Sequence, residues 1–319
     1  MRALITGGAG FIGSHLADRL LERGDQVLLL DDLSTGRLSN IEHLQGNPDA
    51  EFVLGSILNA DLVDHVVSRV DVVYHLAAAV GVNLIVEKPL ESLMTNIRGT
   101  ETVVEKAHKY DKRILVTSTS EIYGKNTSDS LSEDDDRILG SPLKSRWSYS
   151  EAKAIDEILA YTYWREKGLE TVIVRLFNTV GPRQTGSYGM VVPRFVSQAL
   201  RNEAITVFGD GAQTRCFCYV GDVVSGLVAL SEHPEAFGKV FNLGGVEEIS
   251  ISDLATRVIE RSGSSSEVEF IPYDVAYEEG FEDMERRVPN NSRARELVGF
   301  APTASLDDII DQVIADQKK

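Results

Sequence analysis

Cysteine is scarce in this 319-residue chain: there are two, Cys216 and Cys218, separated by a single residue. No histidine or further cysteine lies near enough in the sequence to complete a metal set, so we expect buried thiols, no disulfide framework and no metal site. No apolar run approaches the ~18 residues of a membrane-spanning helix. The first residues already form an apolar strand, which leaves no room for a signal peptide. We therefore expect a cytoplasmic protein that does not cross a membrane.

Basic residues are also few, with 32 Lys and Arg against 49 Asp and Glu and a net charge of −17. This balance argues against nucleic acid or an anionic membrane as the main partner. It still allows a phosphorylated small ligand, because a local pair of arginines can hold one. With 43% hydrophobic and 25% charged residues, the chain has the composition of a soluble globular protein, and its length allows a large core in two lobes.

Glycine is concentrated where the first predicted strand, Ala3–Thr6, meets a helix that begins near Phe11. Gly8, Gly10 and Gly13 fit the G-x-G-x-x-G pattern of dinucleotide-binding turns. In that pattern the glycines permit a tight turn, a close approach of the backbone to a pyrophosphate, and close packing of the helix on the strand. The helix N-terminus then presents unpaired N–H groups to the phosphates. The stretch predicts a dinucleotide site.

An acidic pair follows the second predicted strand, Gln26–Leu30. Asp31 lies roughly 20 residues past the glycines, where an acid binds the adenosine ribose hydroxyls. Asp31 and Asp32 would also repel a 2′-phosphate, which favours NAD over NADP. Arg37 could favour a 2′-phosphate, but it lies several residues further on. We therefore predict NAD as the cofactor.

Apolar strands and helices alternate through the first half of the chain, which predicts an α/β fold with a doubly wound parallel sheet. After Phe177 the alternation weakens, although Val240–Leu243 could return to the main sheet. We expect a nucleotide-binding domain over residues 1–176 plus about 217–245. A smaller C-terminal α/β substrate lobe would comprise residues 177–216 plus 246–319. The further elements that we predict are strands Ala50–Leu54, Val70–Leu76, Arg113–Ser118, Thr171–Leu176, Thr206–Phe208, Cys216–Tyr219 and Val268–Ile271, and helices Ala60–Ser68, Pro89–Tyr110, Ser150–Lys167, Val191–Leu200, Asp222–Ser231 and Leu306–Asp316.

A candidate catalytic group follows the strand Arg113–Ser118. Tyr149 and Lys153 lie four residues apart, so on a helix both project from the same face. An ammonium near a phenol favours the phenolate and lowers the pKa of Tyr149, which makes the tyrosine a usable base near neutral pH. Thr119 directly follows the strand Arg113–Ser118 and is the third candidate. The acidic stretch Ser128–Asp136 between them is expected to be a solvated loop.

Eight stretches taken together resemble the extended short-chain dehydrogenase/reductase family: TGGAGFIG, DDLSTG, YHLAAAVGV, STSEIYG, YSEAK, RLFNTVGPR, FGDGAQTRCFCYVGD and RRVP. They are most similar to the NAD-dependent nucleotide-sugar epimerases, dehydratases and decarboxylases of that family. The resemblance covers almost the full chain and implies a homodimer formed through the helices Pro89–Tyr110 and Ser150–Lys167. It is much less specific for the substrate than for the family.

The resemblance also implies roles for individual residues. Tyr149 would be the base on a sugar hydroxyl, usually at C4, Lys153 would bind the nicotinamide ribose, and Thr119 would hydrogen-bond the same hydroxyl. One departure is Ser56, where many relatives have an aspartate beside the adenine. Besides Tyr149 and Lys153, the implied cofactor contacts are Gly7, Gly10, Phe11, Ile12, Gly13, Asp31, Asp32, Ser34, Gly36, Ser56, Ile57, Leu76, Ala77, Ala78 and Asn96.

The implied substrate contacts are Ser120, Glu121, Asn178, Val192, Arg215 and Arg287. Among them, Asn178 and Arg215 match positions that hold the sugar-nucleotide diphosphate, and Arg287 is the expected second diphosphate arginine. Two guanidinium groups can each donate two hydrogen bonds to pyrophosphate oxygens, which offsets the acidic background.

Several reactions remain open within the family. Ser120 replaces the aspartate of the 4,6-dehydratases and cannot expel a hydroxyl as an acid, which disfavours dehydration. Thr119-Ser120-Glu121 is typical of UDP-glucuronate decarboxylases, whereas the segments Gln184–Met190 and Tyr277–Glu285 are closer to epimerase-type members. We predict a UDP-sugar 4-epimerase that acts through a transient 4-keto sugar, with UDP-glucuronate decarboxylase as the alternative. A non-catalytic NAD-binding protein is disfavoured because Thr119, Tyr149 and Lys153 are all present.

Overall fold

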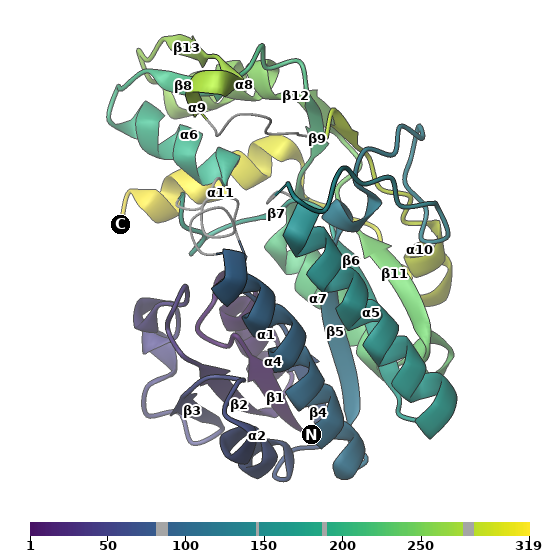
Figure 1. Ribbon diagram of the computed structural model, residues 1–319. Helices are drawn as coiled ribbons and strands as arrows, with labels where there is room; N and C mark the ends of the chain where they lie inside the picture. The colour runs from purple at the N-terminus through teal and green to yellow at the C-terminus, as the bar shows by residue number, and fades with distance from the viewer. Residues whose placement is uncertain (81–88, 145–146, 187–189, 277–283) are drawn as a thin grey trace.

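The centre of the molecule is a parallel sheet of seven strands in the order β11-β6-β5-β4-β1-β2-β3 (Figure 1). The computed structural model describes residues 1–80, 89–144, 147–186, 190–276 and 284–319. The strand order reverses between β1 and β4, and such a switch point opens a ligand crevice at the carboxyl ends of the strands. The predicted doubly wound sheet is therefore confirmed, including the return of the late strand to its edge. The strands are β1 (Arg2–Thr6), β2 (Gln26–Asp31), β3 (Ala50–Leu54), β4 (Val72–His75), β5 (Arg113–Thr119), β6 (Thr171–Leu176) and β11 (Lys239–Leu243).

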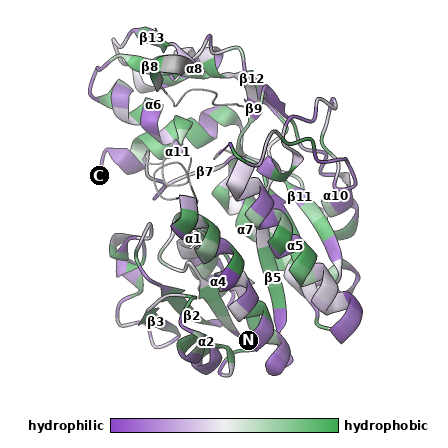
Figure 2. Cartoon of the chain, viewed as in Figure 1, coloured by the Kyte–Doolittle hydropathy of each residue, from purple (hydrophilic) through white to green (hydrophobic). Residues whose placement is uncertain are grey.

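Helices cover both faces of this sheet, because its strands are apolar on both sides (Figure 2). One face packs against α1 (Phe11–Glu22), α7 (Val220–Glu232) and α10 (Ser292–Val298). The other packs against α2 (Ala60–Val67), α4 (Pro89–Lys109) and α5 (Ser148–Lys167). Short 3-10 turns occupy Leu38–Asn40, Glu42–Leu44, Ser120–Tyr123 and Pro234–Ala236.

A second hydrophobic core lies above the carboxyl ends of the strands and is built around Val192, Phe195, Leu254 and Ile310. We use the larger and the smaller lobe as names for the parts built on these two cores; Ala294 and Phe300, which the sequence analysis assigned to the smaller lobe, pack into the core of the larger one. The elements outside the main sheet and its covering helices are β7 (Thr179–Val180), α6 (Val191–Leu200), β8 (Ile205–Phe208), β9 (Thr214–Cys216), β10 (Cys218–Tyr219), β12 (Glu248–Ser250), α8 (Ile251–Ser262), β13 (Val268–Ile271), α9 (Tyr273–Ala276), β14 (Arg286–Arg287) and α11 (Leu306–Gln317).

The predicted strand Cys216–Tyr219 is wrong in one respect. The chain passes between two sheets at Phe217, so Cys216 ends β9 whereas Cys218 begins β10. β9 pairs with β12 and β14, and β10 pairs with β7. Both thiols are buried and free, as expected, and burial raises the pKa of Cys216 to about 12. The two cysteines are therefore unreactive core residues.

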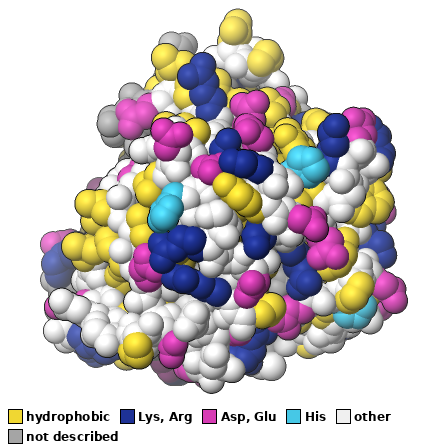
Figure 3. All heavy atoms as spheres, turned by 90° about the horizontal axis from the view of Figure 1, so that it is seen from below, with side chains coloured by type: hydrophobic (Ala, Val, Ile, Leu, Met, Phe, Trp, Pro, Cys, Tyr) yellow, Lys and Arg dark blue, Asp and Glu magenta, His cyan; other side chains and the backbone are white. Residues whose placement is uncertain are grey.

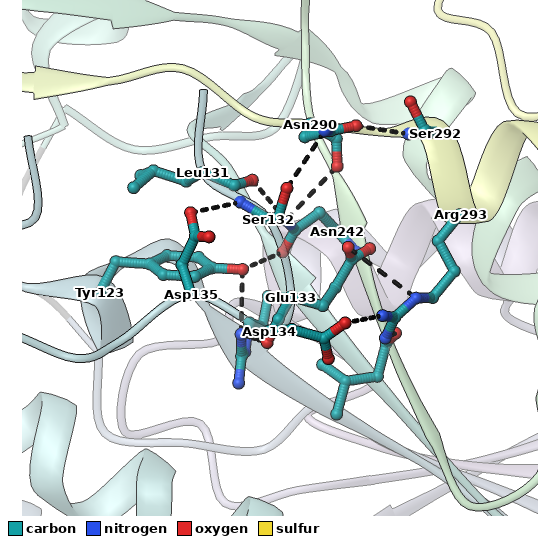
Figure 4. A network of polar contacts seen from close by, with 12 residues as sticks. Tyr123, Leu131, Ser132, Glu133, Asp134, Asp135, Asn242, Asn290, Ser292 and Arg293 are labelled. Carbon is teal, nitrogen blue, oxygen red and sulfur yellow. Dashed lines mark hydrogen bonds and ion pairs between the residues drawn. The ribbon is translucent and has the colours of Figure 1, made fainter. Parts of the chain in front are cut away.

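The acidic stretch Ser128–Asp136, which the sequence predicts to be a solvated loop, is partly buried and hydrogen-bonded to β11 (Figure 4). The Glu133 side chain is buried and accepts a hydrogen bond from the backbone N–H of Asn242 at 2.8 Å. Asn242 in turn donates to the Leu131 carbonyl at 2.9 Å and accepts from the Tyr123 hydroxyl at 2.8 Å. Because an unpaired polar group costs free energy in the interior, this network fixes the loop against β11. Sequence pattern alone does not show such pairing.

Charged side chains of both signs mix over the amino ends of the strands, the face seen in Figure 3. Arg69 and Arg2 both contact Glu51 there, and Arg23 contacts Asp25 and Glu232. Within the described residues, no helix is long and apolar enough to cross a bilayer, and no His/Cys/Asp/Glu group could hold a metal ion. The polar groups that remain to be explained lie at the opposite, carboxyl edge of the sheet.

Candidate active site

A cavity of about 580 Å³ lies between the carboxyl edge of the sheet and the smaller lobe. The larger lobe contributes the glycine loop after β1, the ends of β2, β4 and β5, and the first turns of α5. The smaller lobe contributes α6, the ends of β8 and β9, and β14. Segments far apart in the sequence therefore line one continuous space. This arrangement suits a long ligand that spans both lobes.

The glycine loop is shaped for a phosphate group. Gly7 has φ +72°, a backbone conformation that side chains rarely adopt, and a Cβ added to Gly13 would lie 2.1 Å from the Gly7 carbonyl oxygen. The helix α1 then begins with neither a side-chain cap nor an acidic residue in its first turn. Its first N–H groups and its positive dipole end face the cavity, and together they form an anion site.

Asp31 ends β2 beside this loop. Its Oδ2 accepts from the Ala9 N–H at 2.9 Å and its Oδ1 from the Leu33 N–H at 2.8 Å. Burial raises the pKa of this carboxyl, and the two N–H donors act in the opposite direction. Gly36 lies outside the cavity lining, yet a Cβ there would meet the Asp31 carboxylate at 2.7 Å. The geometry thus holds one fixed acid where a ribose diol would bind, and the residues fit a dinucleotide.

Besides Gly36, two predicted cofactor residues do not line the cavity. Ser56 lies in a turn in which its hydroxyl accepts from the Leu58 N–H at 3.4 Å, while its neighbour Ile57 faces the cavity. Asn96 is buried and makes two hydrogen bonds to the backbone of Ala79, at 2.7 and 3.2 Å. Asn96 therefore fixes the segment after β4. The other predicted cofactor residues that line the cavity are Gly7, Gly10, Phe11, Ile12, Gly13, Asp31, Asp32, Ser34, Leu76, Ala77 and Ala78.

The three predicted catalytic residues do meet at this cavity. Thr119 ends β5, and its hydroxyl accepts from the Glu121 N–H at 3.2 Å. Tyr149 and Lys153 both lie in the first turns of α5 and line the same space. Lys153 Nζ donates to Asp156 Oδ2 at 2.8 Å, a partner that the sequence analysis did not predict. A hydroxyl, a phenol and an ammonium at one point can move a proton to or from a bound hydroxyl.

The predicted substrate residues line the cavity from both lobes. Arg215 and Arg287 are register partners on the parallel strands β9 and β14, and both are among the lining residues. Arg287 Nη1 lies 3.8 Å from Glu121 Oε1 and 3.4 Å from the Ser120 hydroxyl. Arg287 therefore lies beside the catalytic end, next to Thr119. Asn178 and Val192 also line the cavity.

Sequence reasoning missed several residues that line the smaller-lobe end. The Arg194 guanidinium carbon lies 4.4 Å from the centre of the Phe208 ring. Thr179 Oγ1 and Gln184 Oε1 are buried and have no hydrogen-bond partner within the described part of the chain, so they can bind polar ligand groups. Two stretches quoted above could have indicated this end, since Thr179 and Arg183 belong to RLFNTVGPR, and Phe208 and Gln213 to the run that leads to Arg215. The missed lining residues include Thr179, Arg183, Gln184, Arg194, Phe208, Gln213 and Tyr273.

Comparison with known proteins identifies the family. Residues 3–244 match the model of the NAD dependent epimerase/dehydratase family. The chain belongs to this family. Its cofactor is therefore NAD, which agrees with the glycine loop and Asp31.

The sequence relatives of this member of the epimerase/dehydratase family include decarboxylases of UDP-sugars. It is 40% identical to a UDP-N-acetyl-alpha-D-glucosaminuronate decarboxylase of Bacillus cytotoxicus over 98% of this chain and 96% of that one. It is 38% identical to UDP-glucuronic acid decarboxylase 1 of Arabidopsis thaliana over 99% of this chain and 69% of that one.

Solved structures similar to this family member include UDP-sugar epimerases. The UDP-glucuronic acid 4-epimerase of Bacillus cereus, in complex with UDP-glucuronic acid and NAD, superposes with a TM-score of 0.89 at 32% identity, covering 100% of this chain and 99% of that one. The UDP-glucose 4-epimerase of Thermotoga maritima, with UDP-glucose, has a TM-score of 0.89 at 31% identity with the same coverage.

We expect Gly13→Ala to weaken NAD binding by at least about tenfold, equivalent to about 1.4 kcal/mol. The new Cβ would lie 2.1 Å from the Gly7 carbonyl oxygen, so the start of α1 must move away from the loop. Calorimetric titration of NAD measures the effect. The control is Gly24→Ala just beyond the end of α1, where an added Cβ meets no atom within 4 Å but φ is +88°; this variant should lose stability and keep its affinity for NAD. Equal NAD affinities of Gly13→Ala and the unmodified protein would refute the role given to the loop.

Proposed function

We propose that this chain is an NAD-dependent decarboxylase of a UDP-hexuronate such as UDP-glucuronate. The observation that carries the proposal is the Glu121–Arg287 pair, 3.8 Å apart, next to Thr119 at the catalytic end of the cavity. A guanidinium there can bind the carboxylate of a uronate. From the sequence alone, a 4-epimerase was predicted, with a UDP-glucuronate decarboxylase as the alternative. The decarboxylases among the relatives favour the alternative that Thr119-Ser120-Glu121 indicates.

The residues support a reaction that begins with oxidation at C4. Tyr149, as a phenolate, takes the proton of the C4 hydroxyl, and Thr119 hydrogen-bonds to the same oxygen. Lys153 keeps a positive charge beside the phenolate. When bound, NAD supplies the oxidant that takes up a hydride from C4 and later returns it.

Oxidation at C4 places the carboxylate of a uronate β to a ketone. Loss of carbon dioxide then leaves an enolate, whose negative charge develops on the C4 oxygen beside Thr119 and Tyr149. Hydrogen-bond donors at this point stabilise that charge. C5 takes up a proton from solvent, and Tyr149 returns its proton to the C4 oxygen when C4 is reduced again, which gives the UDP-pentose. Arg287 orients the carboxylate, and Glu121 holds Arg287 in place.

Arg287 thus receives a role different from the diphosphate contact expected from the sequence. Its neighbours Ser120 and Glu121 directly follow Thr119, so its guanidinium lies near the sugar end. Arg215, its partner across the β9–β14 register, is assigned to the diphosphate together with Asn178, since both line the cavity. This division of the two arginines is part of the proposal.

A UDP-sugar 4-epimerase is the second candidate, because two UDP-sugar 4-epimerases superpose on this chain with a TM-score of 0.89. Both reactions share the oxidation at C4 and use Tyr149 in the same way. The sequence segments that favour the epimerase fall partly outside the described residues, at positions 187–189 and 277–283.

Incubation with NAD and UDP-glucuronate, followed by measurement of released carbon dioxide, tests the proposal. UDP-glucose, which has no carboxylate, is the matched substrate and should give no carbon dioxide and no UDP-pentose.

We also propose that the chain forms a homodimer through α4 and α5, which lie side by side on one face of the sheet (Figure 1). The outer face of α5 exposes Ile155, Ile158, Tyr161 and Trp164, and Ile158 is 64% exposed. Apolar side chains gathered in this way on one helix are typical of an interface. We expect sedimentation to show a dimer for the unmodified protein and a monomer for Ile158→Asp. Leu143→Asp, at a loop residue that is 94% exposed, should remain dimeric. A monomeric unmodified protein would contradict the proposal.

A further inference from the structure

Lys153 has a buried partner that the reaction proposed above does not use. Its Nζ donates to Asp156 Oδ2 at 2.8 Å, and the two side chains are 3% and 1% exposed. The residues lie three positions apart on α5, on the same face as Tyr149. Buried charges are costly unless they are paired, so the carboxylate and the ammonium stabilise each other here.

The other charged and titratable groups that we describe around this pair come from three elements, β4, α5 and β6. His75 of β4 is fully buried, with its ring nitrogens 2.8 Å from the Thr6 hydroxyl and 3.0 Å from the Thr100 hydroxyl. Burial and the nearby Lys153 lower the pKa of His75 to about 3, so this ring is neutral at physiological pH. It therefore adds no charge beside Lys153.

Glu157, the other acid on this part of α5, has its own partner. Its two oxygens accept from Arg175 of β6 at 2.9 and 2.8 Å, and one of them also accepts from the Ser118 hydroxyl of β5. The charge of Glu157 is thus balanced by Arg175. Asp156 is the anion in direct contact with the Lys153 ammonium.

Asp156 depends on Lys153 for its charge. Burial raises the pKa of the Asp156 carboxyl, whereas Lys153 and Thr100 of α4 act in the opposite direction. Its second oxygen, Oδ1, has no hydrogen-bond partner within the described residues. Of the side chains that act on the Asp156 carboxyl in this way, Lys153 is the charged one, so loss of the Asp156 charge acts on the Lys153 ammonium.

We propose that Asp156 is a positioning residue that, through Lys153, sets the pH at which Tyr149 becomes a base. A positive charge beside a phenol favours the phenolate, and an anion next to that positive charge offsets part of this effect. Asp156 also holds the ammonium on the face of α5 that carries Tyr149. The inference rests on the proposed role of Tyr149 as the base in the reaction above.

Asp156→Asn tests the inference because it removes the charge and keeps the shape. Asp156 and Tyr149 lie seven residues, or about 10 Å, apart along α5. Loss of one negative charge at this distance should move the titration of Tyr149 to lower pH by about half a unit or more. The acid limb of the kcat/KM profile with UDP-glucuronate should move in the same direction.

Two measurements on the full chain follow these changes. The first is the pH dependence of kcat/KM for the NAD-loaded protein. The second is the titration of Tyr149 without substrate, by NMR of protein labelled with ¹³C at the tyrosine Cζ, with the resonance assigned through Tyr149→Phe. Asp156→Ser also removes the charge and should give the same shift, so the test does not depend on one variant folding. Asp156→Glu keeps the charge and should titrate like the unmodified protein.

The control variant is Asp25→Asn. Asp25 is also buried and ion-paired, with Arg23 and the N-terminal amine, but it lies at the amino end of β2. Its loss should leave both titrations unchanged. A fall in kcat for Asp156→Asn with both titrations unmoved would show a merely structural residue and overturn the inference. A shift in the NMR titration without an acid limb in the rate profile would leave the effect of Asp156 on the Tyr149 phenol standing, but it would refute Tyr149 as the base and with it the catalytic role inferred for Asp156.

Discussion

Tyr149→Phe is expected to lower kcat for UDP-glucuronate by about 10³-fold, because general base catalysis contributes about 10²–10⁴-fold. The substitution removes a single hydroxyl from a side chain that is 8% exposed at the cavity wall. Binding of NAD and of UDP should change little, since the ring is kept. The measurement is steady-state turnover, with binding followed by calorimetry.

Tyr161→Phe is the matched control for this variant. It changes the same residue type on the same helix, where the Tyr161 side chain is 40% exposed and remote from the cavity lining. Tyr161 belongs to the face of α5 proposed above as the dimer interface, but phenylalanine keeps the ring, so turnover should stay within about twofold of the unmodified protein. Turnover of Tyr149→Phe at the level of Tyr161→Phe would remove Tyr149 from the mechanism.

Arg287→Met is expected to lower kcat/KM for UDP-glucuronate by at least about 100-fold, because a charge-assisted, nearly buried contact to a carboxylate would be lost. Glu121 would also lose the guanidinium that lies 3.8 Å from it. If Arg287 binds the carboxylate, the Kd for UDP alone should change by less than about threefold, because UDP carries no uronate.

Arg286→Met supplies the comparison for this variant. Arg286 is the neighbouring residue of β14, but its side chain is 38% exposed and pairs with Glu248 at the surface. Exposed ion pairs contribute little, so its kcat/KM should fall by no more than about twofold. A parallel loss of UDP affinity and turnover in Arg287→Met would instead assign this arginine to the diphosphate, as the sequence first suggested.

The parts of the site that the sequence predicted are those in which chemistry is local. The glycine loop and the Tyr149–Lys153 pair depend on spacings of a few residues, and Asp31 depends on its place at the end of the next strand. The structure places all of them at one cavity. The seven-stranded sheet was predictable for the same reason, because each strand and its crossover helix form a contiguous unit.

What escaped prediction depends on contacts between distant segments. Arg194 and Phe208 meet at one end of the cavity. The buried carboxylate of Glu133 accepts a hydrogen bond from the backbone N–H of Asn242. The contact of Lys153 with Asp156 is local, three residues along α5, but the burial of the pair depends on the elements packed around that helix. The choice between epimerase and decarboxylase was made from short sequence motifs. The contact between Glu121 and Arg287 bears on that choice but depends on the fold, so the sequence could not show it.

The most direct test of the proposed decarboxylation is to run the reaction in D₂O with UDP-glucuronate and NAD, and to follow the product by mass spectrometry and proton NMR. A decarboxylase must protonate C5 from solvent, so the expected product is a UDP-pentose with one deuterium at C5 and ordinary hydrogen at C4. An intact uronate with inverted C4 and no deuterium on carbon would contradict the account and establish an epimerase.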